Sequence, residues 1–167
     1  WLPGPEELDL YSDVEFPVPD TLFDDYQGRG PAAADHAMGI DAHMTFAYDL
    51  QIPRGDKERV RRAYNGALKR MSPEQRQRWD AAFEAENKAF LDNPPTGKAL
   101  VHWKYQRYLR NYLRCVAGVD KSLGRILRWL EEKGLAENTL VIYSSDQGFY
   151  LGEHGWFDKR FMYEESL

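Results

Sequence analysis

A short apolar run at residues 140–143, directly after a long helical pattern, restricts the fold more than any other feature of the sequence. The run reads Leu-Val-Ile-Tyr and has polar residues on both sides, which is typical of a strand buried on both faces. The helical pattern before it ends at Lys133-Gly134. Because a helix followed by a buried strand indicates an α/β unit in a parallel sheet, we predict the α/β fold class.

Polar residues that suit a metal site follow the end of this predicted strand. Asp146 and Gln147 are followed by Gly148, and open α/β sheets gather ligand-binding groups beyond the carboxyl ends of their strands. A hard divalent cation takes oxygen ligands, which both side chains offer. Lys159 lies further along the same polar loop and can add a positive charge beside an anion held by the cation. The competing interpretation is a solvated turn with all its charges at the surface.

The order and spacing of residues 144–159, SSDQGFYLGEHGWFDK, resemble the second signature of the type I sulfatases, in the alkaline-phosphatase-like superfamily. In that family an Asp followed by Asn, His or Gln, then Gly, ends a central strand and binds a divalent cation, usually calcium. A Lys later in the signature contacts the sulfate. The resemblance implies that Asp146 and Gln147 bind Ca²⁺, with Mg²⁺ also possible, and that Lys159 is catalytic. His154 is a second catalytic candidate that contacts the substrate or the leaving oxygen, or it caps the loop.

The resemblance extends over nearly the whole chain. Residues 1–25 resemble the sulfatase segment that follows a His-containing motif, and residues 119–140 resemble the helix that leads into the signature. We see no repeat and no second domain, so residues 1–167 are expected to be an internal segment of a single sulfatase domain. The resemblance implies part of an alkaline-phosphatase-like sandwich, with a mostly parallel central sheet and flanking helices, incomplete in this chain.

The nucleophile of that family has no counterpart in this sequence. Type I sulfatases carry C-x-P-S-R or S-x-P-S-R, whose first residue is oxidised to formylglycine, whereas Cys115 is followed by Val-Ala-Gly-Val. The formylglycine and two further metal-binding Asp residues are therefore expected outside this chain, and the chain alone is expected to be inactive. As the only cysteine, Cys115 can form no intrachain disulfide, and we expect it to pack as a small apolar residue.

Composition excludes several classes of protein. Hydrophobic residues make up 43% of the 167 residues, which is enough for a core and argues against a disordered tail. The net charge of −5 argues against a nucleic-acid partner. No run of about 18 apolar residues is present, so no membrane span is predicted. The resemblance implies a secreted or periplasmic protein.

Three helices are predicted before the apolar run, at residues 57–71, at 73 to about 91, and at 96–133. The second should begin at Ser72-Pro73, with Gln75 completing a capping box, and Gly134 should end the third. Apolar residues of the third helix form one stripe, which fits a helix packed on a sheet or a coiled-coil seam. The stripe consists of Tyr105, Leu109, Tyr112, Val116, Val119, Leu123, Ile126 and Leu130.

Residues 26–56 show no clean period and contain two histidines, His36 and His43. A zinc site needs three or four ligands, and no third ligand is near them in the sequence. A surface or pocket-wall role is the expectation for both. The resemblance places this region in an insertion near the substrate pocket of sulfatases.

The function implied by the resemblance is hydrolysis of a sulfuric ester in a sulfated sugar or polysaccharide, which makes a sulfated carbohydrate the partner. The sequence of residues 146–166 most resembles that of bacterial N-acetylglucosamine-6-sulfatase-like enzymes. The first alternative is a phosphoester or phosphonate hydrolase of the same superfamily, although Gln147 stands where those enzymes usually have His. The second is a non-catalytic helical interaction module, since the nucleophile is missing and the apolar stripe is long. The oligomeric state and the sugar are left open.

Overall fold

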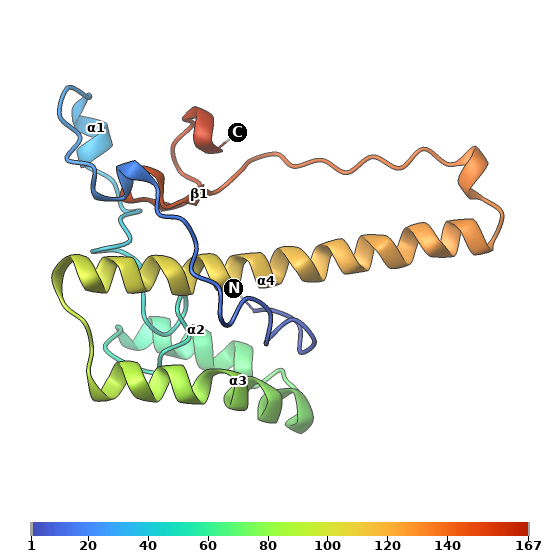
Figure 1. Cartoon of the computed structure of the whole chain (residues 1–167), viewed down its shortest axis with the longest axis horizontal. Helices are drawn as coiled ribbons and strands as arrows, with labels where there is room; N and C mark the ends of the chain where they lie inside the picture. The colour runs from blue at the N-terminus through green and yellow to red at the C-terminus, as the bar shows by residue number, and fades with distance from the viewer. Residues whose placement is uncertain (1, 167) are drawn as a thin grey trace.

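One long helix, α4, runs through the molecule, and the other elements lie on its two sides (Figure 1). In this computed structural model residues 2–166 are described. Helices α2 and α3 pack on one side of α4, whereas α1, the N-terminal 3-10 helix η1 and a hairpin of strands β1 and β2 lie on the other. The helix bounds are Pro31–Ala34 (α1), Glu58–Leu68 (α2), Pro73–Asp92 (α3), Gly97–Glu132 (α4) and Asp20–Phe23 (η1).

The start and the end of the predicted helices agree with their sequence signals. Ser72 Oγ accepts a hydrogen bond from the Gln75 backbone N–H at 3.2 Å, and Gln75 Oε1 accepts from the Ser72 N–H at 2.9 Å. This is the predicted capping box, and it satisfies two N–H groups that the first turn of α3 leaves without partners. After α4, Gly134 adopts φ 67°, a left-handed conformation that glycine reaches without strain.

A buried cation joins α3 to α4. The Arg107 side chain is fully buried, and its guanidinium pairs with Glu86, donates to Asn87 Oδ1 at 2.8 Å and donates to the Leu50 carbonyl at 3.2 Å. Burial lowers the pKa of Arg107, and the charge of Glu86 acts in the opposite direction. Because a desolvated guanidinium must keep its partners, this contact fixes how the two helices and the 50–51 segment meet.

The opposite face of α4 holds the hairpin. Strands β1 (Tyr150–Leu151) and β2 (Phe157–Asp158) pair antiparallel, with Tyr150 opposite Asp158. Tyr108 on α4 donates from its hydroxyl to the Tyr150 carbonyl at 3.0 Å. At the turn Gly152 has φ 109°, and a Cβ there would lie 2.6 Å from the Tyr105 ring. Only glycine allows both that conformation and that approach.

Within residues 2–166, residues 140–143 do not form the buried strand that the sequence predicts. The segment is extended, but Leu140, Ile142 and Tyr143 are 85%, 78% and 72% exposed. It runs back from the far end of α4 without pairing (Figure 1). A strand needs a neighbouring strand for its N–H and C=O groups, and residues 2–166 supply none at this place.

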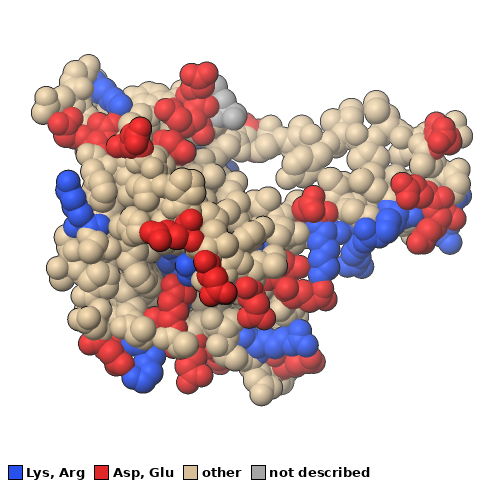
Figure 2. Space-filling view, viewed as in Figure 1, with Lys and Arg blue, Asp and Glu red and all other residues tan. Residues whose placement is uncertain are grey.

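The predicted parallel sheet is likewise absent from residues 2–166, whose only sheet is the two-stranded antiparallel hairpin. The second half of α4 is correspondingly uncovered: the apolar stripe is buried at Tyr105 and Leu109 but exposed at Val116, Val119 and Ile126. Figure 2 shows that the extended segment beside it is largely free of charged side chains. An apolar helix face and an apolar extended segment therefore lie side by side in solvent.

Cys115 has the partly buried surroundings expected from the sequence. The Cys115 thiol is free and half-buried, and burial raises its pKa. Among the described residues no helix is both long and apolar enough to cross a membrane.

Loss of the capping box should destabilise the α3 region. Ser72→Ala is expected to cost about 1 kcal/mol of unfolding free energy, because Gln75 N–H loses its acceptor. Urea titration followed by circular dichroism measures the change. Ser122→Ala is the matched control, since the exposed Ser122 hydroxyl only donates to the Gly118 carbonyl within α4. An equal loss in both variants would contradict the capping role.

Removal of the Glu86 carboxylate, which pairs with Arg107, should lower the unfolding free energy more than loss of the capping box does. Glu86→Ala leaves a buried guanidinium with fewer partners, and breaking such a pair typically costs about 3–5 kcal/mol. We expect the lower end of this range because the Glu86 side chain is 34% exposed. Glu86→Gln retains an acceptor and should cost clearly less in the same denaturant titration. A loss below about 1 kcal/mol in Glu86→Ala would show that the pair behaves like a surface salt bridge.

Candidate functional site

The hairpin brings Gln147 beside Lys159, although they are separated by twelve residues of the chain. Gln147 Nε2 donates to the Lys159 carbonyl, just outside the paired strands β1 and β2. Asp146 precedes Gln147, and its exposed carboxylate makes no hydrogen bond or ion pair within residues 2–166. The exposed Lys159 ammonium lies 5.8 Å from the centroid of the Phe149 ring. Three of the four predicted site residues therefore gather at the open end of the hairpin.

Asp146 and Gln147 fit a divalent cation as part of a donor set. Both side chains offer oxygen, and the Asp146 carboxylate has no competing partner in the described part of the chain. No group of three or more His, Cys, Asp or Glu residues within residues 2–166 has an arrangement that could hold a metal ion. Since calcium takes six to eight oxygen ligands, these two side chains would have to share the ion with other groups.

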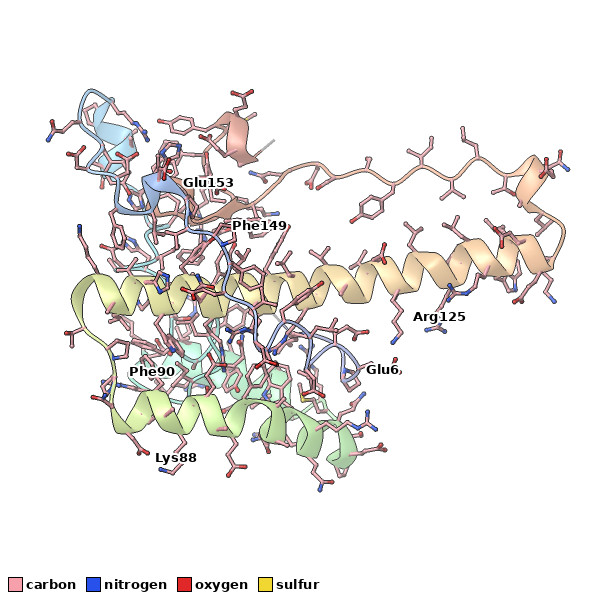
Figure 3. The ribbon with its side chains drawn as sticks, in the orientation of Figure 1. Glu6, Lys88, Phe90, Arg125, Phe149 and Glu153 are labelled. Carbon is pink, nitrogen blue, oxygen red and sulfur yellow. The ribbon has the colours of Figure 1, made fainter. Side chains whose placement is uncertain are left out.

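His154, the fourth predicted site residue, lies at the opposite end of the hairpin. The turn between the strands is the 3-10 helix η3 (Glu153–Gly155), which packs against η1. In Figure 3 the labelled Glu153 lies near η1, whereas the labelled Phe149 lies nearer the middle of α4. The structure thus separates His154 from the open end where Gln147 and Lys159 meet.

Charged side chains from two other segments enclose the His154 imidazole, which is 8% exposed. Its Nδ1 lies 2.9 Å from Asp24 Oδ2 and 2.9 Å from Arg29 Nη1, and its Nε2 lies 3.0 Å from Glu165 Oε1. Arg29 also pairs with Asp24 at 2.7 Å. We call these four residues the His154 clasp. Both ring nitrogens already have partners, which favours the loop-capping interpretation of His154 over contact with a substrate.

The backbone of His154 is held as firmly as its ring. Its N–H donates to Thr21 Oγ1 at 3.0 Å, and its carbonyl accepts from the Tyr26 hydroxyl at 2.7 Å. The residue has φ 57°, a left-handed conformation that is unfavourable for a side chain with a Cβ. The contacts from the 21–29 segment keep the turn in this conformation.

The clasp stabilises the charged forms of its two carboxyl groups. For Asp24, burial alone would raise the pKa, but hydrogen bonds from the Tyr26 N–H and His154, together with the charge of Arg29, lower it below the usual 3.8. For Glu165, a hydrogen bond from its own backbone N–H, the bond with His154 and the charges of His154 and Arg29 lower the pKa below the usual 4.5. Both groups are therefore carboxylates at neutral pH.

A cavity of about 720 Å³ lies next to the clasp and is lined by Asp24, Tyr26, His36, His43 and Lys98, among others. His36 Nδ1 accepts from the Met38 N–H at 3.0 Å, and His43 Nδ1 accepts from the Gly39 N–H at 3.0 Å. Burial, followed by the charge of His43, lowers the pKa of His36. The two histidines are wall residues of this cavity, which is one of the two roles that the sequence left open, and no third metal ligand joins them in the described structure.

Sequence reasoning missed Asp24, Arg29 and Glu165. Arg29 lies in the segment with no clean period and Asp24 just before it, 125 and 130 residues from His154. Acidic and basic residues in such a segment are usually solvated, so nothing in the local pattern marked these two as partners of a buried imidazole. Glu165 is one of two adjacent glutamates, and only the turn at η4 (Glu164–Ser166) decides which one reaches His154.

The chain is similar to known proteins over almost its whole length. The family model described as Sulfatase matches residues 24–166. An N-acetylglucosamine-6-O-sulfatase from Bacteroides thetaiotaomicron is 45% identical over 99% of this chain and 30% of its own length. A sulfatase from Formosa agariphila is 37% identical over 44% of this chain and 14% of its own length.

A solved structure is similar over almost the whole chain. It contains a protein in complex with its substrate, D-glucosamine-2-N,6-O-disulfate. The similarity has a TM-score of 0.89 and 44% identity, and it covers 99% of this chain and 34% of the other. The present chain therefore spans about a third of the length of the N-acetylglucosamine-6-O-sulfatase and of the protein in this solved structure.

The clasp should make stability depend on pH in acid. A carboxyl group whose pKa is lower in the folded than in the unfolded state stabilises the fold above the unfolded value and loses this contribution as pH falls through the folded value. The unfolding free energies of wild type and Asp24→Asn should differ most above about pH 5 and converge as pH falls below 3.8, the usual pKa of Asp24.

Chemical denaturation between neutral pH and pH 3 measures this difference. Asp25→Asn is the control, because the Asp25 carboxylate accepts from the Gln27 N–H and forms no ion pair with Arg29 or His154 within residues 2–166. A difference between wild type and Asp24→Asn that stays constant with pH would contradict the electrostatic account of the clasp.

Proposed function

Because this chain belongs to the sulfatase family, we propose that the protein containing it removes sulfate from a sulfated sugar, with 6-O-sulfated glucosamine or N-acetylglucosamine as the substrate class. Similarity over the whole chain to an N-acetylglucosamine-6-O-sulfatase supports this class. The observation on which the proposal depends is the hairpin that brings Gln147, and Asp146 next to it, beside Lys159. Such an arrangement can place a bound cation and the Lys159 ammonium against the same sulfate group.

In this proposal Asp146 and Gln147 supply two of the oxygen ligands for a calcium or magnesium ion. A bound cation would polarise the sulfuryl oxygens and stabilise the negative charge that develops on them. Asp146 supplies the negative charge that attracts the ion, while neutral Gln147 keeps the site less anionic than a second carboxylate would. The remaining ligands and the formylglycine nucleophile are expected to come from residues outside this chain.

The Lys159 ammonium is proposed to contact the sulfate directly. It is exposed and makes no ion pair within residues 2–166, so its charge is available to an anion. As charge builds up on the sulfuryl oxygens, this contact strengthens, and a preorganised contact of this kind lowers the barrier. The hairpin supplies the preorganisation, since the Gln147 side chain holds the Lys159 carbonyl.

We further propose that residues 140–143 become a strand of a mostly parallel central sheet in the longer protein, within an alkaline-phosphatase-like sandwich. Support comes from the exposed apolar side chains of this segment and of the second half of α4. Burial of such side chains in a sheet would stabilise the fold by about 25 cal/mol per Å² of apolar surface removed from water. Action on polysaccharides and a secreted or periplasmic location are part of the same proposal.

The choice between sulfatase and phosphoester hydrolase can be tested directly. The full-length enzyme is expected to hydrolyse N-acetylglucosamine 6-sulfate faster than N-acetylglucosamine 6-phosphate, and 4-nitrophenyl sulfate faster than 4-nitrophenyl phosphate. Release of sulfate or phosphate is measured by ion chromatography. A preference for both phosphate esters would overturn the sulfatase assignment, and no turnover of any ester would favour a non-catalytic role.

Metal content and activity should be lost together when the charged ligand is removed. Asp146→Ala in the full-length enzyme is expected to lower both bound calcium or magnesium and sulfate release, because a neutral methyl cannot replace a carboxylate ligand. Metal is measured by elemental analysis of the purified protein. Asp120→Ala, at an exposed position of α4, is the control and should keep its metal. A fully metal-loaded Asp146→Ala enzyme would refute the ligand assignment.

Removal of the ammonium should slow the reaction without unfolding the protein. Lys159→Ala is expected to lower kcat by about 10²–10³, the typical cost of losing one preorganised transition-state contact. Lys159→Arg should restore activity only in part, because a planar guanidinium does not reproduce a point charge. Lys133→Ala is the surface control. A Lys159→Ala enzyme within about threefold of wild type would assign Lys159 to a solvated surface position.

A further inference from the structure

We propose that His154 is a positioning residue: the His154 clasp fixes the strained tip of the hairpin and thereby sets where the Lys159 ammonium points. The inference rests on the proposed function, since it assumes that Lys159 contacts the sulfate. It assigns a role to Asp24 and Arg29, which pack at the tip, and to Glu165, whose neighbour Ser166 accepts from the Gly148 N–H at 2.9 Å. In this role the clasp touches neither substrate nor metal.

The arrangement of the imidazole argues for positioning rather than for chemistry. Nε2 faces the Glu165 carboxylate at 3.0 Å and donates to it. Nδ1 donates to Asp24 when protonated and accepts from Arg29 when unprotonated, both at 2.9 Å. In either state both ring nitrogens are engaged, so none is left for a substrate atom. Two other segments of the chain, at residues 24–29 and at residue 165, are instead tied to this one ring.

The tip of the hairpin needs these contacts because its backbone conformation is unfavourable. His154 has φ 57° and Asp158, directly before Lys159, has φ 76°. Residues with a Cβ hold left-handed conformations only where their surroundings over-determine them, and such residues concentrate at functional sites. At His154 the surroundings are the clasp, with Thr21 on its N–H and Tyr26 on its carbonyl.

The hairpin is short enough to transmit the orientation of the tip. Only two residue pairs, Tyr150–Asp158 and Leu151–Phe157, join the strands, and from outside the hairpin the Met38 carbonyl accepts from the Phe157 N–H at 2.9 Å. The Trp156 indole N–H donates to the Tyr26 hydroxyl at 2.8 Å, which anchors the start of the returning strand to the same segment as His154. A tip that relaxed to an ordinary conformation would rotate Asp158 and with it the Lys159 side chain.

The test is a double-mutant cycle in the full-length enzyme. Asp24→Asn keeps the Oδ1 acceptor used by the Tyr26 N–H but removes the charge that faces Arg29 and His154. We expect kcat to fall about tenfold to a hundredfold, since small displacements of a catalytic group have costs of this order. In a Lys159→Ala background the same substitution should change kcat by less than about twofold, because its effect requires the ammonium.

A purely structural role predicts a different result. If Asp24→Asn lowered activity by the same factor with and without Lys159, the clasp would act on folding or on another group, and the inference would be overturned. Thermal unfolding shows whether each variant is folded at the assay temperature. Should Asp24→Asn fail to fold, Glu165→Gln takes its place in the cycle, because its amide oxygen still accepts from Nε2. Asp25→Asn is the control and should behave as wild type.

The cycle separates failure of this inference from failure of the proposed function. If Lys159→Ala alone has no effect, the proposed sulfate contact is wrong, and the clasp cannot affect the reaction through Lys159. If Lys159→Ala lowers kcat but Asp24→Asn and Glu165→Gln leave it unchanged, the contact stands and the positioning role of the clasp is refuted.

Discussion

The structure depends on buried cations of α4 that must find oxygen partners. Lys104, Arg107 and Arg114 are all buried, and burial lowers the pKa of each. A desolvated charge without partners is costly, so each of them collects oxygen atoms from a different part of the chain. The acceptors are the Ile40 and Asp41 carbonyls for Lys104, Leu50, Glu86 and Asn87 for Arg107, and Leu10 and Ser12 for Arg114. Segments without regular structure are thereby fixed to one helix.

Buried polar contacts also hold the hairpin that contains the candidate site. Tyr108 holds β1 from below, and the His154 clasp holds the tip from the side of η1. A scaffold of buried polar contacts is directional, because hydrogen bonds fix orientation where apolar packing tolerates rotation. Such a scaffold suits a site whose proposed chemistry depends on the direction of one ammonium group, Lys159.

The second half of α4 and residues 140–143 have a different character. Several of their apolar side chains are exposed, and no buried cation occurs beyond Arg114 on this helix. This chain spans about a third of the length of two of the proteins it is similar to, and a parallel strand requires neighbouring strands, so the sheet proposed above would bury these side chains. The α/β pattern in the sequence and the helical structure of residues 2–166 are consistent if the sheet is formed with the remainder of a sulfatase domain.

The sequence by itself determined the helices and the signature. The Ser72 capping box and the Gly134 stop are local signals, as is the order of Asp146, Gln147 and Lys159, and local signals are readable because their partners lie within a few residues or in a fixed spacing. Only the tertiary structure decided the pairing of Gln147 with Lys159 and the environment of His154. Its partner Asp24 lies 130 residues away. Periodicity carries no information on contacts at that separation, which arise from how the whole chain packs on α4.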